Sequence, residues 1–139
     1  SGAPSGQTKG VAYMRVCVVE RDEAFNQILC QELANAGHRV ATAYNANAGL
    51  HPLGTDVFDG LVLGISASHT SGNSITAWIR QVYPELKIII VASVPELMQS
   101  SARERLSELG ADALLLRPFD GAQLIETLQS AVAGMPDAG

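Results

Sequence analysis

The sequence lacks the features that mark several large classes of protein. Basic residues are outnumbered, with 9 Lys and Arg against 14 Asp and Glu, and the formal net charge is −5. Binding to the phosphate backbone of nucleic acids needs a concentrated positive field, so we expect no direct nucleic-acid partner. No apolar run approaches the roughly 20 residues that a membrane helix needs, so we expect no membrane partner either.

Cysteine is also scarce, and the two that occur do not form a motif. Cys17 lies in a short apolar run typical of a strand, and Cys30 lies in a helical pattern. There is no Cys-x-x-Cys and no cluster of His and Cys that would indicate a zinc site. We interpret both as buried or half-buried thiols in a reducing, cytoplasmic setting rather than as a disulfide or metal site, and we expect no cofactor.

The chain does have enough apolar residues to form one hydrophobic core. Hydrophobic residues make up 47% of the 139 residues, which suits one compact domain rather than a disordered tail. Residues 1–10 are rich in small and polar residues and lack the apolar segment of a signal peptide. We predict an ordered domain over residues 11–133, a tag or linker over 1–10 and a linker tail over 134–139, all within a larger protein.

Strand-like and helix-like patterns alternate along the chain. Short apolar and β-branched runs predict five strands, at residues 16–19, 39–44, 60–63, 87–91 and 113–116. Apolar residues at helical spacing predict a helix after each strand, at about residues 22–36, 46–53, 74–82, 95–109 and 120–132. Asp22 and Asp120 supply N-caps, Gly37 ends the first helix, and Pro52 is expected to end or bend the second.

This alternation predicts an α/β fold. Right-handed crossovers between parallel strands place helices on both faces of the sheet. We predict a doubly wound (βα)5 sandwich with a five-stranded parallel sheet of order 2-1-3-4-5, as in flavodoxin-like proteins. The site of such a sheet lies beyond the carboxyl ends of the strands. The residues there are Glu20, Arg21, Gly64, Ala92 and Arg117, with a loop of small and polar residues at 64–73 beside them. His38 and His51 are expected at the surface.

Short motifs occur in a characteristic order from about residue 15 to residue 132. They are Val18-Val19-Glu20, Gly37-His38-Arg39-Val40, Asp59-Gly60-Leu61-Val62-Leu63, Gly72, Ile79-Arg80, Pro84-Glu85, Gly110-Ala111-Asp112-Ala113 and Arg117-Pro118-Phe119-Asp120. Each is weak alone, but together and in order they resemble the response-regulator receiver family, the CheY-like domains of two-component signalling.

The resemblance implies a specific set of site positions. Active receivers accept a phosphoryl group on an Asp that ends the third strand, and an acidic pair after the first strand helps to hold Mg²⁺. A Thr or Ser after the fourth strand and a Lys after the fifth contact the phosphoryl oxygens, and an aromatic residue in the fifth strand acts as a switch. In this sequence the positions fall, in that order, on Gly64, Glu20 and Arg21, Ala92, Arg117 and Leu114.

These departures predict that the phosphorylation chemistry is lost. Gly64 has no side chain to phosphorylate, and Asp59, about 17 Å away along the strand, is too far to replace it. Arg21 places a cation where Mg²⁺ needs an oxygen ligand. The charges of Glu20, Arg21 and Arg117 sum to +1, against −2 in the active pattern. We therefore expect a degenerate pseudo-receiver with no catalytic residue, no metal and no enzyme activity.

Several uses of the altered pocket stay open. Arg21 is expected to take the vacated metal position and to pair with Glu20 or Asp22, which would lock the pocket in one state. Alternatively, Arg21 and Arg117 converge on an anion such as a cyclic dinucleotide. The loop residues Ser66, Ser68 and His69 show no Ser-His-Asp order that would indicate a hydrolase.

The function that we predict is signalling through protein contacts. The expected partners are other domains of the same protein, or a histidine kinase or output domain. A homodimer could use the face formed by the fourth helix, fifth strand and fifth helix, where residues 95–109 carry both apolar and charged side chains. An inert structural or dimerisation domain is a further alternative. The resemblance also implies a cis peptide bond between Arg117 and Pro118.

Overall fold

The computed structural model describes residues 13–70, 73–98 and 110–134. Its main sheet has five parallel strands in the order β2-β1-β3-β6-β7. Their bounds are Arg15–Val19 for β1, Arg39–Ala43 for β2, Gly60–Gly64 for β3, Lys87–Ser93 for β6 and Ala113–Arg117 for β7. In chain order this is the predicted 2-1-3-4-5 sheet, so the predicted fold class is confirmed.

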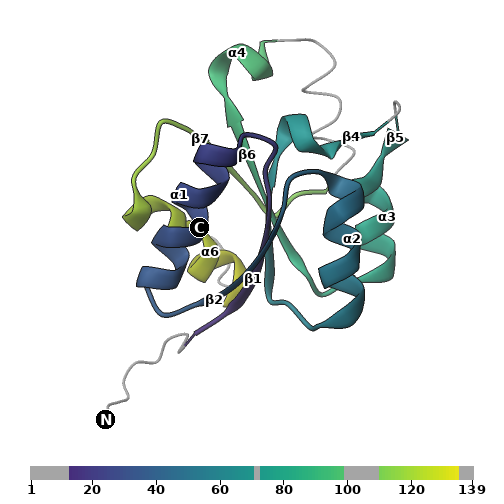
Figure 1. Cartoon of the computed structure of the whole chain (residues 1–139), viewed down its shortest axis with the longest axis horizontal. Helices are drawn as coiled ribbons and strands as arrows, with labels where there is room; N and C mark the ends of the chain where they lie inside the picture. The colour runs from purple at the N-terminus through teal and green to yellow at the C-terminus, as the bar shows by residue number, and fades with distance from the viewer. Residues whose placement is uncertain (1–12, 71–72, 99–109, 135–139) are drawn as a thin grey trace.

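The sheet is covered on both faces (Figure 1). Helices α1 (Glu23–Asn35) and α6 (Gly121–Val132) pack on one face, where Leu29, Leu33, Leu124 and Leu128 are at most 1% exposed. Helices α2 (Ala46–Thr55) and α3 (Ile75–Val82) cover the other face. β1, β3 and β6 lie between neighbouring strands, and apart from Arg15, Lys87 and Ser93 at strand ends their residues are buried and lack polar side chains, as the short apolar runs predict.

The helix ends follow the predicted capping residues. The Asp22 carboxylate accepts the N–H of Phe25 at the start of α1, and the Asp120 carboxylate accepts the N–H of Gln123 at the start of α6. Gly37 follows α1 with φ +93°, a conformation that favours glycine. The two carboxylates fix where α1 and α6 begin, and Gly37 fixes where α1 ends. The helix boundaries in turn help to position the strand ends that carry the site.

Two predicted elements differ in detail. Pro52, which was expected to end or bend the second helix, does not end it. Helix α2 continues to Thr55, whose hydroxyl donates to the carbonyls of His51 and Pro52. The described part of the predicted loop at 64–73 contains regular structure. The short helix η1 (Ile65–Ser68) is followed by a two-stranded antiparallel ladder of β4 (His69–Thr70) with β5 (Asn73–Ser74). Local backbone pairing of this kind leaves no hydrophobic periodicity in the sequence.

The predicted fourth helix, residues 95–109, is only partly within the described residues. The structure describes α4 as Val94–Leu97, and residues 99–109 lie outside the described part. The predicted linker 1–10 and residues 135–139 of the predicted tail 134–139 also lie outside it. None of the helices in the described residues is long and apolar enough to cross a membrane.

His38 is buried, which corrects its predicted place at the surface. It is 6% exposed, and its Nδ1 accepts the backbone N–H of Met14 at 3.0 Å, just before β1. His51 is exposed, as predicted. The residues around His38 show no apolar pattern that would indicate burial. The hydrogen bond that buries His38 joins it to Met14, 24 residues earlier in the chain, and such a contact leaves no local signal in the sequence.

The buried His38 predicts that the fold weakens in acid. Burial lowers the pKa of His38, so the folded state disfavours its protonated form. The stabilisation is therefore complete above the unfolded-state pKa of about 6.5 and is lost as the pH falls below it. In urea unfolding from pH 8 to pH 5, wild type should lose more stability than His38→Gln, whose amide oxygen can still accept the Met14 N–H. Equal pH profiles would contradict this role.

Candidate functional site

Four site residues meet at the carboxyl edge of the sheet, where α4 follows β6 (Figure 1). An open hollow of about 310 Å³ is lined there by Glu20, Arg21, Asp22, Ser66 and Arg117. Gly64 ends β3 and lies directly beside the Glu20 side chain. Ala92 is fully buried within β6 and does not line the hollow. The structure thus brings together Glu20, Arg21, Gly64 and Arg117, as predicted.

The Glu20 carboxylate occupies the space beside the bare backbone of Gly64. Glu20 is only 3% exposed, and its Oε2 accepts the backbone N–H of Asp22 at 2.9 Å. A Cβ atom built on Gly64 would overlap Oε1 of Glu20 and lie 3.0 Å from its Cδ. Any side chain at position 64 would therefore compete with Glu20 for the same volume.

A buried amide fixes the backbone from which Glu20 projects. Asn26 on α1 is 1% exposed, and its Nδ2 donates to the carbonyl oxygens of Glu20 and Ala43, each at 3.0 Å. Its Oδ1 accepts from the Thr42 hydroxyl on β2. Asn26 ties α1 to the ends of β1 and β2, and a satisfied buried amide of this kind rigidifies its surroundings.

The surroundings of Glu20 act on its charge in opposite directions. Burial raises the pKa of Glu20, and this effect is larger than the lowering by the Asp22 N–H and by the Arg117 guanidinium. The Asp22 N–H and the Arg117 guanidinium thus only partly offset the effect of burial on the Glu20 carboxylate.

Arg117 is held by an aromatic ring and a second carboxylate. Its guanidinium carbon lies 4.6 Å from the centroid of the Phe25 ring, and that ring packs edge-on against Phe119. Its terminal nitrogen lies 3.7 Å from Oε1 of Glu96. The same Glu96 oxygen accepts from the backbone N–H and the hydroxyl of Ser93. The Glu96 N–H donates to the Ser93 hydroxyl oxygen, which completes the capping box of α4. Arg117 therefore connects the hollow to the start of α4.

The predicted ion pair of Arg21 with Glu20 or Asp22 is not formed. Within the described part of the chain, Arg21 has no carboxylate within 4 Å. The reason is geometric, because the Glu20 carboxylate turns inward beside Gly64 and the Asp22 carboxylate caps α1. Arg21 is left exposed at the rim of the hollow.

Asp22 and the loop residue Ser66, both expected beside the arginines, line the hollow. Sequence reasoning missed two residues that shape it, because Phe25 stacks on Arg117 and Glu96 pairs with Arg117. With Asp22 counted, the lining carries two carboxylates and two guanidinium groups, so its formal charge is zero rather than +1. The pattern Ser93-x-x-Glu96 was a readable capping-box signal, whereas the stacking of Phe25 left no local signature.

The other residues singled out in the sequence lie away from the hollow or outside the described residues, apart from the peptide bond that follows Arg117. Asp59 lies at the opposite edge of the sheet, where its Oδ2 accepts the N–H of Arg15. Leu114 is 41% exposed on the edge strand β7. The Arg117–Pro118 bond is cis, as predicted. The loop residues Ser71 and Gly72 lie outside the described residues. Among the residues that are described, no group of three or more His, Cys, Asp and Glu side chains could hold a metal ion.

A model of one protein family covers most of this architecture. The response regulator receiver domain matches residues 16–129. The chain belongs to this family. The receiver chain also resembles curated proteins, among them the DNA-binding transcriptional regulator NtrC of Azospirillum brasilense, with 26% identity over 84% of this chain and 24% of that protein. Response regulator MprA of Mycobacterium avium is 27% identical over 84% of this chain and 50% of its own length.

Solved structures agree with the fold. A receiver domain protein from Methanospirillum hungatei superposes with a TM-score of 0.77 at 21% identity, covering 92% of this chain and 100% of that one. The chemotaxis response regulator CheY4 of Vibrio cholerae gives 0.73 at 20% identity, over 86% and 99%. This receiver spans only a quarter to a half of the curated relatives, which are longer proteins.

The contact between Glu20 and Gly64 predicts a coupled pair of substitutions. Gly64→Ala should destabilise the fold by about 1–3 kcal/mol, because the new methyl group must displace a buried carboxylate. In a Glu20→Ala background the same substitution should cost much less, and a double-mutant cycle from urea unfolding measures the difference.

Gly54→Ala is the matched control for this cycle. A Cβ at position 54 meets nothing within 4 Å, so this substitution should cost nothing in either background. Additive costs for Gly64→Ala and Glu20→Ala would show that the two positions do not compete for space.

Proposed function

We propose that this receiver is a phosphorylation-independent signalling module that acts through contacts with other proteins or domains. The observation that carries the proposal is the buried Glu20 carboxylate beside Gly64, at the position where an active receiver presents its acceptor Asp. A glycine offers no oxygen for an acyl phosphate, and the space of a side chain is already filled.

The oxygens around the hollow also do not fit the Mg²⁺ that active receivers use. Magnesium requires near-octahedral oxygen ligands at short distances. One Glu20 oxygen accepts the Asp22 N–H, and the other faces the backbone of Gly64. The second acidic position carries Arg21, and Asp22 uses an oxygen to cap α1. This donor set supports a module without the metal.

The contacts of Arg117 support a single, fixed state of the site. In the family pattern, a Lys at this position and a hydroxyl after the fourth strand close on the phosphoryl group. Here the guanidinium is stacked on Phe25 and lies beside Glu96, while the Ser93 hydroxyl donates to the same Glu96 carboxylate. The start of α4 is thereby held by groups of the protein itself, and the exposed Leu114 supplies no aromatic switch.

The partners that we propose follow from the family. The curated relatives are transcriptional regulators and response regulators of which a receiver forms only part. We propose that the partners are other domains of the same regulator, an output domain or a histidine kinase. A homodimer through α4, β7 and α6 is a weaker proposal, since most of the predicted fourth helix lies outside the described residues.

An anion sensor is the second candidate, and one contact favours it. The Nε of Arg117 is buried without a hydrogen-bond partner among the described residues, so it could donate to a bound anion. The carboxylates of Glu20 and Asp22 line the same hollow and would repel such a ligand. The zero net charge of the lining therefore favours the interaction module.

Phosphoryl transfer is the direct test of the proposal. Incubation with acetyl phosphate and Mg²⁺ should leave the intact mass unchanged, because no carboxylate occupies the acceptor position. Gly64→Asp alone should also stay unmodified, since Glu20 fills the space and Arg21 opposes the metal. A receiver with a complete site is the positive control, and a stable gain of one phosphoryl group by the wild-type chain would refute the proposal.

Nucleotide binding separates the two candidates. In thermal shift measurements against mononucleotides and cyclic dinucleotides, the interaction module should show no rise in melting temperature. A rise with one nucleotide that disappears in Arg117→Ala would favour the anion sensor instead.

A further inference from the structure

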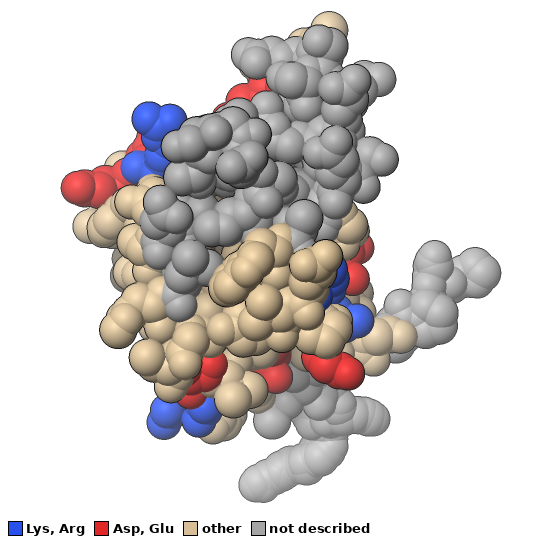
Figure 2. All heavy atoms as spheres, turned by 90° about the vertical axis from the view of Figure 1, so that its right-hand side faces the viewer, with Lys and Arg blue, Asp and Glu red and all other residues tan. Residues whose placement is uncertain are grey.

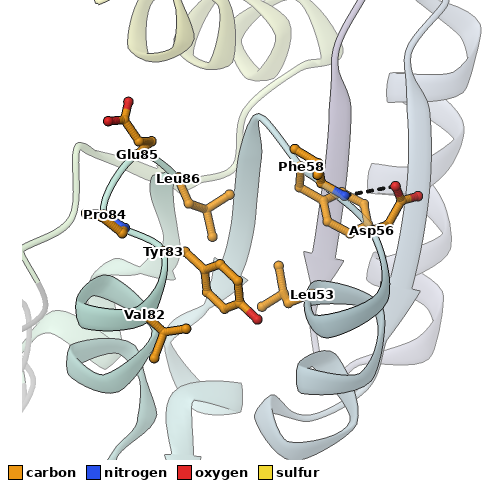
Figure 3. Close-up of a pocket in the computed structure, with 9 residues that line it drawn as sticks. Leu53, Asp56, Phe58, Val82, Tyr83, Pro84, Glu85 and Leu86 are labelled. Carbon is orange, nitrogen blue, oxygen red and sulfur yellow. Dashed lines mark hydrogen bonds between the residues drawn. The ribbon is translucent and has the colours of Figure 1, made fainter.

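The hollow at the carboxyl edge differs in chemistry from a groove at the opposite edge of the sheet. The groove has a volume of about 280 Å³ and is lined mostly by apolar side chains, among them Leu53, Phe58, Val82 and Leu86. Figure 3 shows these side chains around the groove, with the Glu85 carboxylate pointing away from them. On this side of the molecule, charged side chains lie around the margin of the part that is not grey (Figure 2). A charged ligand therefore finds its counter-charges in the hollow and not in the groove.

The two guanidinium groups of the hollow have N–H donors that the chain does not use. Arg117 stacks on Phe25 and lies 3.7 Å from Glu96, but its side chain forms no hydrogen bond with any residue that the structure describes. Arg21 is exposed at the rim without a carboxylate partner in the same part of the chain. A guanidinium is a planar fork of donors that matches the two oxygens of a carboxylate. These groups favour a ligand that carries a carboxylate.

The carboxylates of the hollow keep acceptor capacity of their own. Asp22 Oδ1 accepts the N–H of Phe25, whereas its Oδ2 has no donor among the described residues. Glu20 accepts one N–H, from Asp22, and burial still raises the pKa of Glu20. A cationic N–H group in the hollow would bond to Asp22 and reduce the cost of the buried Glu20 charge. The hydroxyl of Ser66 adds a further polar group to the lining.

The opposite charges of the hollow face the same space without pairing directly. Over the described ranges, neither Glu20 nor Asp22 has a carboxylate oxygen within 4 Å of a guanidinium nitrogen of Arg21 or Arg117. The space that they line has a volume of about 310 Å³. Pockets for small molecules range from roughly 300 to 1,000 Å³, so this one suits a small ligand rather than a dinucleotide.

We propose that the hollow binds a small zwitterion of the amino-acid class, with its carboxylate on Arg21 and Arg117 and its ammonium group on Asp22. Charge selects this occupant. The lining carries two charges of each sign, so a ligand with one charge of each sign is attracted at both ends. A simple anion is opposed by the carboxylates, and a simple cation by the guanidinium groups. A phosphate monoester carries a charge of about −2 near neutral pH and is opposed more strongly than a carboxylate.

This inference rests on the proposed function and adds a means of regulation to it. The hollow is available to such a ligand because no metal ion or phosphoryl group is expected there. Arg117 also contacts Glu96, which caps α4, so a ligand on Arg117 would act on the start of that helix. The amino acid would then supply the input that phosphorylation supplies in active receivers.

Amide NMR spectra test the proposal on the wild-type chain. Among the common protein amino acids, each added at millimolar concentration, at least one should shift the amide signals of Arg21, Asp22 and Ser66 in a saturable way. The matching acid without the amine, and the matching amine without the acid, should each bind about tenfold more weakly or worse, because each lacks one pole. For alanine these probes are propionate and ethylamine.

Two substitutions remove one pole of the site each. Arg21→Ala should weaken binding by about tenfold, since it deletes an exposed guanidinium. Asp22→Asn should do the same, and it keeps a side-chain oxygen that can cap α1. The matched controls are Arg39→Ala, at the exposed start of β2 at the opposite edge, and Asp120→Asn, at the N-cap of α6. Both controls should bind as wild type does.

Three results would overturn the proposal. They are a panel with no saturable shift at the hollow, binding of the acid or the amine as tight as that of the amino acid, and equal weakening by the control substitutions. The intact mass after treatment with acetyl phosphate separates this failure from that of the proposed function. An unchanged mass with no amino acid bound refutes the zwitterion site alone, whereas a gained phosphoryl group refutes the proposed function.

Discussion

The carboxyl edge of this receiver depends on the contact between a buried carboxylate and a bare backbone. Glu20 projects from the end of β1 into the space beside Gly64, and its burial is tolerated because Asp22 donates a hydrogen bond and Arg117 is near. The backbone below it is fixed by Asn26, which joins α1 to two strands. The rest of the carboxyl edge is arranged around this filled position.

Arg117 carries the effect of this arrangement to α4. Its guanidinium is stacked on Phe25 and lies beside Glu96 of α4. Because the Glu96 carboxylate also caps α4 together with Ser93, the start of α4 is tied to the end of β7. In the proposed module, these contacts within the chain take the place of the contacts that an active receiver makes to a phosphoryl group. The proposed module would therefore present one fixed arrangement of this edge to its partners.

The sheet could be predicted from sequence because apolar strand runs and capping residues are local signals, and the structure reproduces all five strands and their order. The residues of the hollow were also predictable, since parallel strands end at one edge. The inward turn of Glu20 could not be foreseen, because it depends on the space left by Gly64, 44 residues away. The same holds for His38 and for the stack of Phe25 on Arg117, which depend on contacts distant in sequence.

The central claim is that Glu20, not a metal ion with an acceptor Asp, fills the carboxyl edge. Paramagnetic broadening by Mn²⁺ in amide NMR spectra tests it most directly. At a Mn²⁺ concentration that removes the site amides of a receiver with a complete site, the amide signals of Glu20, Asp22 and Gly64 should persist here. Selective and saturable loss of those three signals would show that a divalent cation binds beside Gly64, and would contradict the claim.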